Sequence, residues 1–374
     1  MIQQNEVMDL PYGGIEKGQL YLAGDIGGTK TLLGLYSLEG TELVLVRERN
    51  FPSKDWQDLT ALIQGFLDEI ALTPEDITGG CLSLAGPITQ DKCFLTNLNR
   101  VIHCPDLRSS LPLRKPLILV NDLEAMGQGL MDLRGEDLIC LNPSAESPSS
   151  SLASPPALSL ARPSLNRALI APGTGLGQAM ILADGRVCAT EGAHGDYAPR
   201  TEQEVRLWRF LAQRYGHVSY ERVLSGPGLA DIYQFLHWEA LPSSLPDLAS
   251  DSIPAPDSIL TPAEITKRAL GGICPLCTET LELFVKILGA EAGNLALRTL
   301  AYGGIYLGGG IPPKILPKLQ EDGFLEAFLA KGRLRDLLSQ IPIYVILNER
   351  TPLLGAARLA VAAGYPPTCS QKRT

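Results

Sequence analysis

The sequence contains the same local pattern twice, once in each half of the chain. In each copy an apolar run leads into a turn of glycines and a threonine, and a second apolar run follows. The first copy lies at residues 25–30 and the second at residues 172–177. Glycine lets the backbone approach a ligand closely, so each tip exposes N–H groups and a hydroxyl that can cradle phosphate oxygens. The repetition predicts a duplicated architecture with the active cleft between the halves.

A structural interpretation of the first turn stands beside the functional one. An ordinary glycine hairpin needs no ligand, and these residues taken alone fit it well. The second, related turn changes the balance, because it makes the first turn one member of a pair. Asp25 lies two positions before Gly27, the start of the first turn, where its carboxylate could hold a cation or a water near bound phosphates.

The order of the predicted elements indicates an α/β protein. Apolar alternation and buried-type runs mark the strands, and apolar residues at helical spacing mark the helices. In the first half we expect a strand hairpin at 21–36, strands at 43–51, 80–84 and 117–120, a helix at 55–71 and a helix ending near Leu133. In the second half we expect strands at 138–141, 168–171, 178–182, 303–307 and 343–347, and helices at 201–215, 227–238, 262–270, 277–300, from Pro312 and from Pro352.

The same pattern predicts the domain organisation. Residues 1–19 form an N-terminal extension, and residues 20–133 form a small α/β domain that a C-terminal helix at 352–366 completes. Residues 134–351 form a large α/β domain. It carries two Pro/Ser-rich inserts of low periodicity at 142–166 and 241–262, which are typical of solvent loops or disordered segments.

Composition excludes several classes of function. The 374-residue chain has a net charge of -9, which argues against nucleic-acid binding because such binding needs a basic face. No apolar run reaches the length of a membrane span. The polar start of the chain lacks a secretory apolar core, so we expect a cytoplasmic protein.

The eight cysteines form no disulfide framework in a chain of this length without a signal peptide. The pair Cys274 and Cys277 is the only C-x-x-C motif. Four-ligand zinc needs two further ligands at suitable spacing, and no nearby pair supplies them. Ordinary thiols are therefore favoured over a metal or redox site.

The most informative carboxylate is Asp122, which follows a buried-type strand. Open α/β sheets place ligand-contacting residues at the carboxyl ends of their strands. Asn121 precedes it and can both donate and accept hydrogen bonds. Together the two side chains could grip a hydroxylated substrate and take its proton. The alternative is that they cap the following helix, a role that Asn and Asp favour.

A second polar group follows the second glycine turn. Glu191 and His194 are three residues apart and are separated by Gly192 and Ala193, so both could turn toward one ligand. A solvated loop explains them equally well. Glu221 by itself fits a surface residue or a partner of Arg222. No HExxH motif is present, so we do not assign these residues to a metal.

Read in order along the chain, these motifs resemble bacterial-type glucokinases. The resemblance covers about residues 20–363 and rests on segments 25–30, 84–88, 96–97, 120–122, 172–177, 191–194, 221–228 and 307–312, with further likeness at 323–324, 331–333, 341–344 and 353–355. That family has the sugar-kinase/actin/heat-shock ATPase fold. The resemblance therefore implies a two-domain actin-like ATPase (ribonuclease H-like) fold with duplicated α/β units and an interdomain cleft.

The resemblance implies ATP-dependent phosphorylation of the 6-hydroxyl of D-glucose, the entry step of glycolysis. It makes Asp122 the general base and places the sugar among Asn121, Asp122, Glu191, His194 and Glu221, bordered by Thr96 and Asn97. It assigns the phosphates of ATP to Gly27, Gly28, Thr29, Gly173, Thr174 and Gly175, and the nucleotide side to Gly308, Gly309 and Gly310.

The same resemblance places Asp25 near Mg²⁺, with water between them. The cysteine-rich zinc motif of the related repressor/open-reading-frame/kinase group is missing, so the chain is similar to the zinc-free branch. The implied partners are glucose and ATP, with no nucleic acid and no membrane, and a homodimer is left open. Two alternatives remain at this stage: a kinase for mannose or another hexose, and a sugar-binding regulator without catalysis.

Overall fold

The computed structural model describes residues 20–86, 88–89, 91–95, 98, 100–143, 165–240 and 260–364. The N-terminal extension, most of both Pro/Ser-rich inserts, and Thr96 and Asn97 lie outside these ranges. The chain divides into two compact units. The first unit comprises Met1–Leu133 and Arg350–Thr374, and the second is Arg134–Glu349. The chain thus leaves the first unit once and returns to it near the C-terminus.

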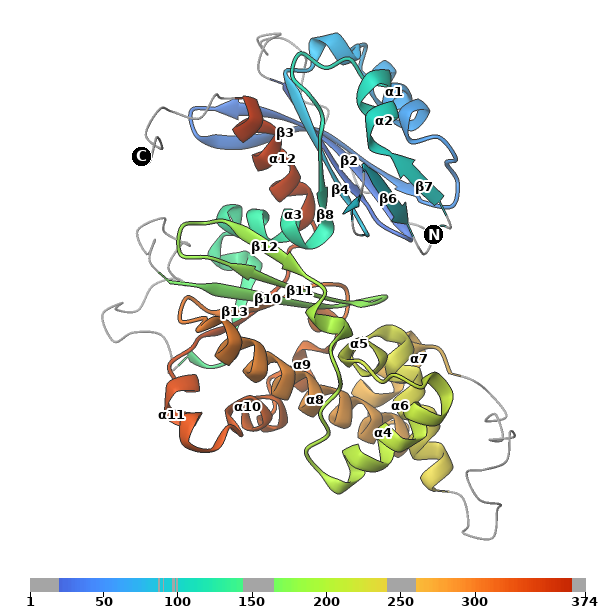
Figure 1. Ribbon diagram of the computed structural model, residues 1–374, viewed down its shortest axis with the longest axis vertical. Helices are drawn as coiled ribbons and strands as arrows, with labels where there is room; N and C mark the ends of the chain where they lie inside the picture. Colours follow the sequence, from blue (N-terminus) through green and yellow to red (C-terminus); the bar gives the residue numbers. More distant parts are fainter. Residues whose placement is uncertain are drawn as a thin grey trace. The chain divides into compact units, whose positions relative to one another are not determined.

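A five-stranded sheet in the order β3-β2-β1-β4-β8 forms the centre of the first unit (Figure 1). Strands β1, β2 and β3 make an antiparallel meander, whereas β4 and β8 run parallel to β1. The carboxyl ends of β1, β4 and β8 therefore meet at one edge of the sheet. Their bounds are β1 Leu20–Ile26, β2 Lys30–Glu39, β3 Glu42–Pro52, β4 Gly79–Leu84 and β8 Ile118–Asn121.

Helices cover both faces of this sheet, because successive residues of β1 point to opposite sides. Leu20 and Leu22 pack in the core beneath α1 (Leu59–Asp68) and α2 (Cys104–Ser110). Tyr21 and Ala23 pack in a separate core beneath α12 (Thr351–Gly364). Figure 1 shows α12 on this face with α3 (Asp122–Gly129) beside it.

Two glycines allow α3 and α12 to cross at close range. A Cβ atom on Gly355 would lie 1.7 Å from the carbonyl oxygen of Ala125, and one on Gly129 would lie 2.0 Å from that of Thr351. Neither position tolerates a side chain without separating the helices. This contact fastens α12, which is remote in sequence, to the helix that begins at Asp122.

A small three-stranded antiparallel sheet was not predicted. It consists of β5 (Ile88–Thr89), β6 (Lys92–Leu95) and β7 (Arg100–His103), and it leads into α2. The helix predicted at 55–71 is shorter than expected. It begins at Leu59 because the Asp58 side chain accepts a hydrogen bond from Thr60 N, which caps the helix there.

The second unit repeats the plan of the first. Its six-stranded sheet has the order β12-β11-β10-β13-β14-β9. An antiparallel meander of β10, β11 and β12 continues into β13 and β14, which run parallel to β10, and β9 closes the edge antiparallel to β14. The bounds are β9 Leu138–Cys140, β10 Arg167–Pro172, β11 Leu176–Ile181, β12 Val187–Thr190, β13 Ile305–Leu307 and β14 Ile343–Ile346.

The helices of the second unit pack around α8, which is 25 residues long. They share one core with Ile170, Ile305 and Leu307 of the sheet. A 3₁₀ turn at Pro312–Ile315, rather than an α-helix, follows Pro312, and α9 begins at Leu316. The bounds are α4 Glu202–Tyr215, α5 Tyr220–Val223, α6 Gly226–Glu239, α7 Pro262–Leu270, α8 Pro275–Thr299, α9 Leu316–Leu319, α10 Asp322–Leu329 and α11 Arg335–Leu338.

Within the described ranges, no helix combines the length and the apolar character that crossing a bilayer requires.

Candidate functional site

The first glycine turn joins β1 to β2 and is braced from behind by Ser53. The Ser53 hydroxyl donates to Gly27 O at 2.7 Å and shares a 2.9 Å hydrogen bond with the Thr31 hydroxyl. Ser53 N donates to Thr29 O at 3.0 Å. Trp56 Nε1 donates to the Thr31 hydroxyl at 2.9 Å and closes the buried side of the turn. The Thr29 side chain is exposed, as a tip that meets a ligand requires.

Asp25 lies near the carboxyl end of β1, two positions before Gly27. Its register partner in the parallel strand β4 is Ser83, whose hydroxyl donates to Asp25 Oδ1 at 3.2 Å. Burial raises the pKa of Asp25 to about 6, although the Ser83 hydrogen bond and the charge of Lys30 act in the opposite direction. Asp25 is therefore a carboxyl group whose charge changes in mildly acidic solution.

The donor set around Asp25 fits Mg²⁺ held through water. Mg²⁺ usually keeps several waters and takes one or two carboxylates together with substrate phosphates. Among the described residues, no group of three or more His, Cys, Asp and Glu side chains could hold a metal ion by itself. A single carboxylate beside a glycine turn fits a Mg²⁺ ion held mainly by waters and substrate phosphates, and does not fit an ion held by protein side chains alone.

Asn121 and Asp122 stand where β8 ends and α3 begins. Asn121 caps the helix, since its Oδ1 accepts Leu123 N at 2.9 Å, and its Nδ2 donates to Gly86 O at 3.3 Å. Asp122 Oδ1 also accepts Leu123 N at 2.9 Å, and its side chain is half-buried. The capping interpretation is thus correct for Asn121. Capping and ligand binding are compatible here, because the hydrogen bonds to Leu123 N hold both side chains at this edge of the sheet.

The first unit brings Asp25, the glycine turn and Asp122 to one edge of its sheet. Leu84 of β4 pairs with Asn121 of β8, and Ser83 of β4 pairs with Asp25 of β1. Neighbouring strands lie about 4.8 Å apart, so the backbones at Asp25 and Asn121 are separated by roughly 10 Å. This edge of the first unit therefore carries one carboxylate beside a glycine turn and another at the start of a helix.

The second glycine turn packs against two other glycine-rich segments. Gly173 N donates to Gly175 O at 2.8 Å, and Gly226 N at the start of α6 donates to Gly173 O at 2.8 Å. A Cβ atom on Gly309 would lie 2.6 Å from Pro172 O, and the φ angle of Gly309 is +80°. Only glycine suits that position. The structure therefore brings the predicted phosphate residues 173–175 and nucleotide residues 308–310 together.

Glu191, His194 and Glu221 form one cluster in the second unit. His194 Nε2 lies 3.5 Å from Glu191 Oε2, and His194 Nδ1 lies 4.0 Å from Glu221 Oε1. The other Glu221 oxygen accepts Leu176 N at 3.0 Å. The expected pairing of Glu221 with Arg222 is wrong, because the Arg222 guanidinium instead stacks 4.2 Å from the ring of Tyr215. Hydroxyl groups of a sugar are suitable partners for such an open, polar cluster.

A buried polar network beneath this cluster was missed from the sequence. Gln178 Nε2 donates to Glu291 Oε1 at 2.9 Å, and Arg298 donates to both oxygens of Glu291. Asn294 Nδ2 donates to Glu291 and to the hydroxyl of Tyr220, the residue before Glu221. This network ties α8 to both β11 and α5. The only sequence signal was a glutamate and an asparagine, Glu291 and Asn294, within the otherwise apolar stretch 287–296 of α8.

Gln178 also sets the turn that carries Glu191 and His194. A Cβ atom on Gly192 would lie 2.7 Å from Gln178 Oε1, so the turn packs directly on that side chain. The Thr190 hydroxyl donates to Gln178 O at 3.1 Å and accepts Gly192 N at 3.2 Å. Glu291 and Gln178 are thus positioning residues for the cluster.

Known structures with this architecture include a glucokinase from an Antarctic psychrotroph. It is 28% identical, has a TM-score of 0.72, and the alignment covers 92% of this chain and 99% of that one. A ROK family glucokinase from Streptomyces griseus, solved with glucose and AMPPNP, is 18% identical with a TM-score of 0.53 over 92% of this chain and 99% of its own. These likenesses place the protein in the actin-like ATPase fold, and the predicted fold class is confirmed.

Comparison of sequences identifies the family to which the chain belongs. The family model for glucokinase matches residues 22–363. A glucokinase of Nostoc sp. (strain PCC 7120) is 38% identical over 91% of this chain and 98% of its own length. A glucokinase of Yersinia enterocolitica is 34% identical over 92% and 97%. The chain belongs to the glucokinase family, as the resemblance implied.

Proposed function

We propose that this protein is a glucokinase that transfers the γ-phosphoryl group of ATP to the 6-hydroxyl of D-glucose. The observation that carries the proposal is the placement of Asp122 on the same sheet edge as Asp25 and the first glycine turn. The relatives and solved structures described above support glucose as the substrate. A cytoplasmic role at the entry of glycolysis follows from that reaction.

Asp122 is the general base in this proposal. It accepts the proton of the 6-hydroxyl as the oxygen attacks the γ-phosphorus, a contribution of ~10²–10⁴ in rate for a positioned base. Asn121, fixed by its contacts with Leu123 N and Gly86 O, helps to bind the sugar. The N-terminus of α3 also favours negative charge at Asp122. Thr96 and Asn97 complete the sugar border in this proposal.

The remaining groups bind and orient the substrates. Glu191, His194 and Glu221 hold the other sugar hydroxyls, and a site that pairs each hydroxyl rejects an analogue lacking one, because its own polar groups then go unpaired. Gly27 N and Gly173 N already donate to Lys30 O and Gly175 O, so the backbone N–H groups of residues 28–29 and 174–175 bind the phosphate oxygens. Residues 308–310 border the nucleotide. Asp25 would hold Mg²⁺ through water, and the ion would supply positive charge that offsets the charge of the phosphates.

Replacing Asp122 tests the assignment. We expect Asp122→Asn and Asp122→Ala to lower kcat by ~10²–10⁴ while calorimetric titration still detects glucose binding in Asp122→Asn. Glu124→Gln, a change in the same helical turn, serves as the control and should keep normal turnover. Near-normal kcat in Asp122→Ala would remove Asp122 from the role of base.

A coupled assay over a panel of hexoses and phosphate donors tests the substrate. We expect glucose with ATP to give the highest kcat/KM. A higher kcat/KM with mannose would assign the enzyme to another hexose. Glucose binding without turnover of any hexose in the unmodified protein would identify a regulator instead of a kinase.

A further inference from the structure

The C-x-x-C motif lies where α7 ends and α8 begins, in the second unit. Cys274 is the N-cap of α8, with φ -132° and ψ 109°, and its sulfur accepts the backbone N–H of Cys277 at 3.4 Å. Cys277 sits in the first turn of the helix and is fully buried, whereas Cys274 is partly exposed. The two sulfurs therefore occupy neighbouring positions, one facing solvent and one behind it.

The surroundings differentiate the two thiols. Burial acts to raise the pKa of Cys274, but hydrogen bonds from Cys277 and from Leu276 N, with the charge of Arg268, lower it below the ordinary value. Burial, together with the hydrogen bond and charge of Cys274, raises the pKa of Cys277 to about 12. A thiol of lowered pKa at the start of a helix, beside a buried thiol of raised pKa, is the arrangement of an attacking and a resolving cysteine.

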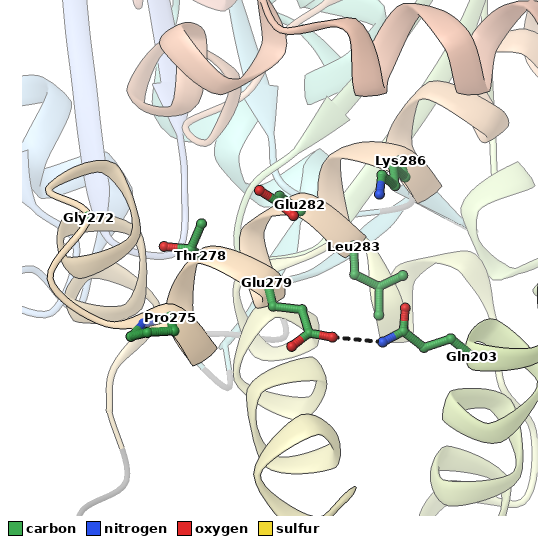
Figure 2. A pocket seen from close by; sticks show the side chains of 8 residues that line it. All are labelled: Gln203, Gly272, Pro275, Thr278, Glu279, Glu282, Leu283 and Lys286. Atoms are coloured by element: carbon green, nitrogen blue, oxygen red, sulfur yellow. Dashed lines mark hydrogen bonds between the residues drawn. The ribbon is translucent and has the colours of Figure 1, made fainter. Parts of the chain in front are cut away.

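The site is accessible from the side of Cys274. Ile273 is 75% exposed and Leu270 is 42% exposed, and Gly272 has a φ angle of +63° that turns the chain sharply before the motif. Gly272 and Pro275, which flank the first cysteine, line a cavity of about 580 Å³ between α4 and α8 (Figure 2). Gln203 and Glu279 join across its wall by a 2.9 Å hydrogen bond.

The other described thiols lack this arrangement. Cys81, Cys93 and Cys104 are buried in the first unit, and burial raises the pKa of Cys93 to about 11. Cys140 and Cys188 are partly exposed, but each lies on a strand, and neither is near another cysteine in sequence. Among the described cysteines, the sequence-based interpretation as ordinary thiols is therefore weakest for Cys274 and Cys277.

We propose that Cys274 and Cys277 form a redox-active dithiol that is reversibly oxidised to a disulfide by exchange with a small disulfide such as oxidised glutathione. The Cys274 thiolate attacks one sulfur of glutathione disulfide, which forms a mixed disulfide and releases one glutathione thiolate. Cys277 then loses its proton and attacks Cys274 Sγ, which releases the second glutathione. The protein loses two electrons and two protons, and one glutathione disulfide becomes two glutathione thiols.

The fold accepts this bond without unfolding the helix. Residues three apart at a helix start are neighbours on one face, and a disulfide needs Cα atoms about 4.4–6.8 Å apart. The first turn of α8 would exchange the sulfur cap for a covalent link across the same two residues. This site lies outside the residues proposed for phosphoryl transfer, so it stands or falls independently of that proposal.

Thiol labelling of the full chain tests the proposal. The protein is incubated with excess oxidised glutathione, alkylated and digested, and mass spectrometry measures the mass of the peptide containing residues 274–277. We expect that peptide to lose two hydrogens and both alkylation sites, and to regain them after dithiothreitol. In Cys277→Ser we expect Cys274 to remain as the glutathione mixed disulfide. In Cys274→Ser we expect Cys277 to stay reduced, because it is buried.

Cys188→Ser is the matched control and should oxidise like the unmodified chain. Without oxidant, we expect iodoacetamide to label Cys274 about tenfold faster than Cys277, since only the thiolate reacts. The proposal is overturned if both cysteines remain alkylatable after oxidation, or if the unmodified chain stops at the mixed disulfide on Cys274. Formation of a bond from either residue to another cysteine would overturn it as well.

Discussion

The two glycine turns occupy equivalent places in two sheets of the same plan, yet they carry different chemistry. The residue two positions before the first turn is Asp25, and the residue two positions before the second is Ala171. The first turn is braced by the Ser53 side chain, through its hydroxyl on Gly27 O, in addition to the backbone hydrogen bond from Ser53 N to Thr29 O. The second is braced by backbone, through Gly226 N on Gly173 O, and its charged neighbour Glu221 reaches it from α5.

This difference gives the two turns different charged neighbours. Both turns present backbone N–H groups, which suit phosphate regardless of the side chains nearby. The charge that distinguishes them comes from within the strand in the first unit and from a separate helix in the second. In the proposed reaction, the cation and the proton transfer therefore fall in the first unit, and the second unit contributes Glu191, His194 and Glu221 to sugar binding.

Asp25→Asn removes the charge that distinguishes the first turn from the second, and among the changes to the two turns we expect it to have the largest effect. Removing the carboxylate should lower kcat on the order of 10²-fold, as loss of one electrostatic group in such a site does. Activity of the unmodified enzyme should also fall as the pH drops through about 6, where Asp25 takes up a proton. Steady-state assays across that range measure both effects, with the exposed Asp68→Asn on α1 as the control.

The same substitution should stabilise the protein. The folded-state pKa of Asp25, about 6, lies above its ordinary 3.8, so folding penalises the ionised form. The penalty is complete above pH 6, up to about 3 kcal/mol, and is relieved as the pH falls from 6 toward 4. Denaturant unfolding should show Asp25→Asn to be more stable than the unmodified protein at pH 7.5. That gain in stability should be smaller near pH 4. Equal stability at both values would contradict a penalised carboxylate.

Gly175→Ala tests the link between the second turn and Glu221. The new Cβ atom would lie 2.5 Å from Glu221 Oε2, so the carboxylate must move from Leu176 N and from His194. We expect KM for glucose to rise about tenfold, the factor that corresponds to one charge-assisted hydrogen bond. In Gly323→Ala, the control, the nearest atom to the new Cβ is 3.7 Å away. An unchanged KM for glucose in Gly175→Ala would separate Glu221 from sugar binding.

Ser53→Ala should have the smallest effect and sharpens the contrast between the two braces. Loss of the hydroxyl leaves Gly27 O and Thr31 without this partner, so we expect about 1–2 kcal/mol of destabilisation and a few-fold rise in KM for ATP. Ser225→Ala removes the cap of α6 at a similar cost of about 1 kcal/mol. It leaves the backbone brace of Gly173 intact, so KM for ATP should not change. Chemical denaturation and ATP titration distinguish the two variants.

Much of the fold could be predicted because its main strands are long apolar runs next to glycine turns. Strands β1, β2 and β10 and helix α8 lie close to the predicted ranges. Strands β5, β6, β7 and β12 were missed. They have two to four residues each, which is too short for a period of two to stand out, and their pairing rather than their composition defines them.

The candidate site divides in the same way. Asn121 and Asp122 could be identified because a strand end is visible in the sequence. Gln178 and Glu291 could not, because they are 113 residues apart and look like isolated polar residues until the chain is folded. The clustering of His194 with both Glu191 and Glu221 likewise depends on β11, α5 and the turn between them.

The sequence by itself determined the α/β class, the duplicated turns, the strand-end position of Asp122 and membership of the glucokinase family, because local patterns and motif order record these directly. Only the tertiary structure decided that Asp25 is a penalised carboxylate, that Glu221 contacts the second turn instead of Arg222, and that Cys274 caps Cys277 at the start of α8. Each of these depends on burial or on contacts between distant segments, and both quantities exist only after the chain has packed.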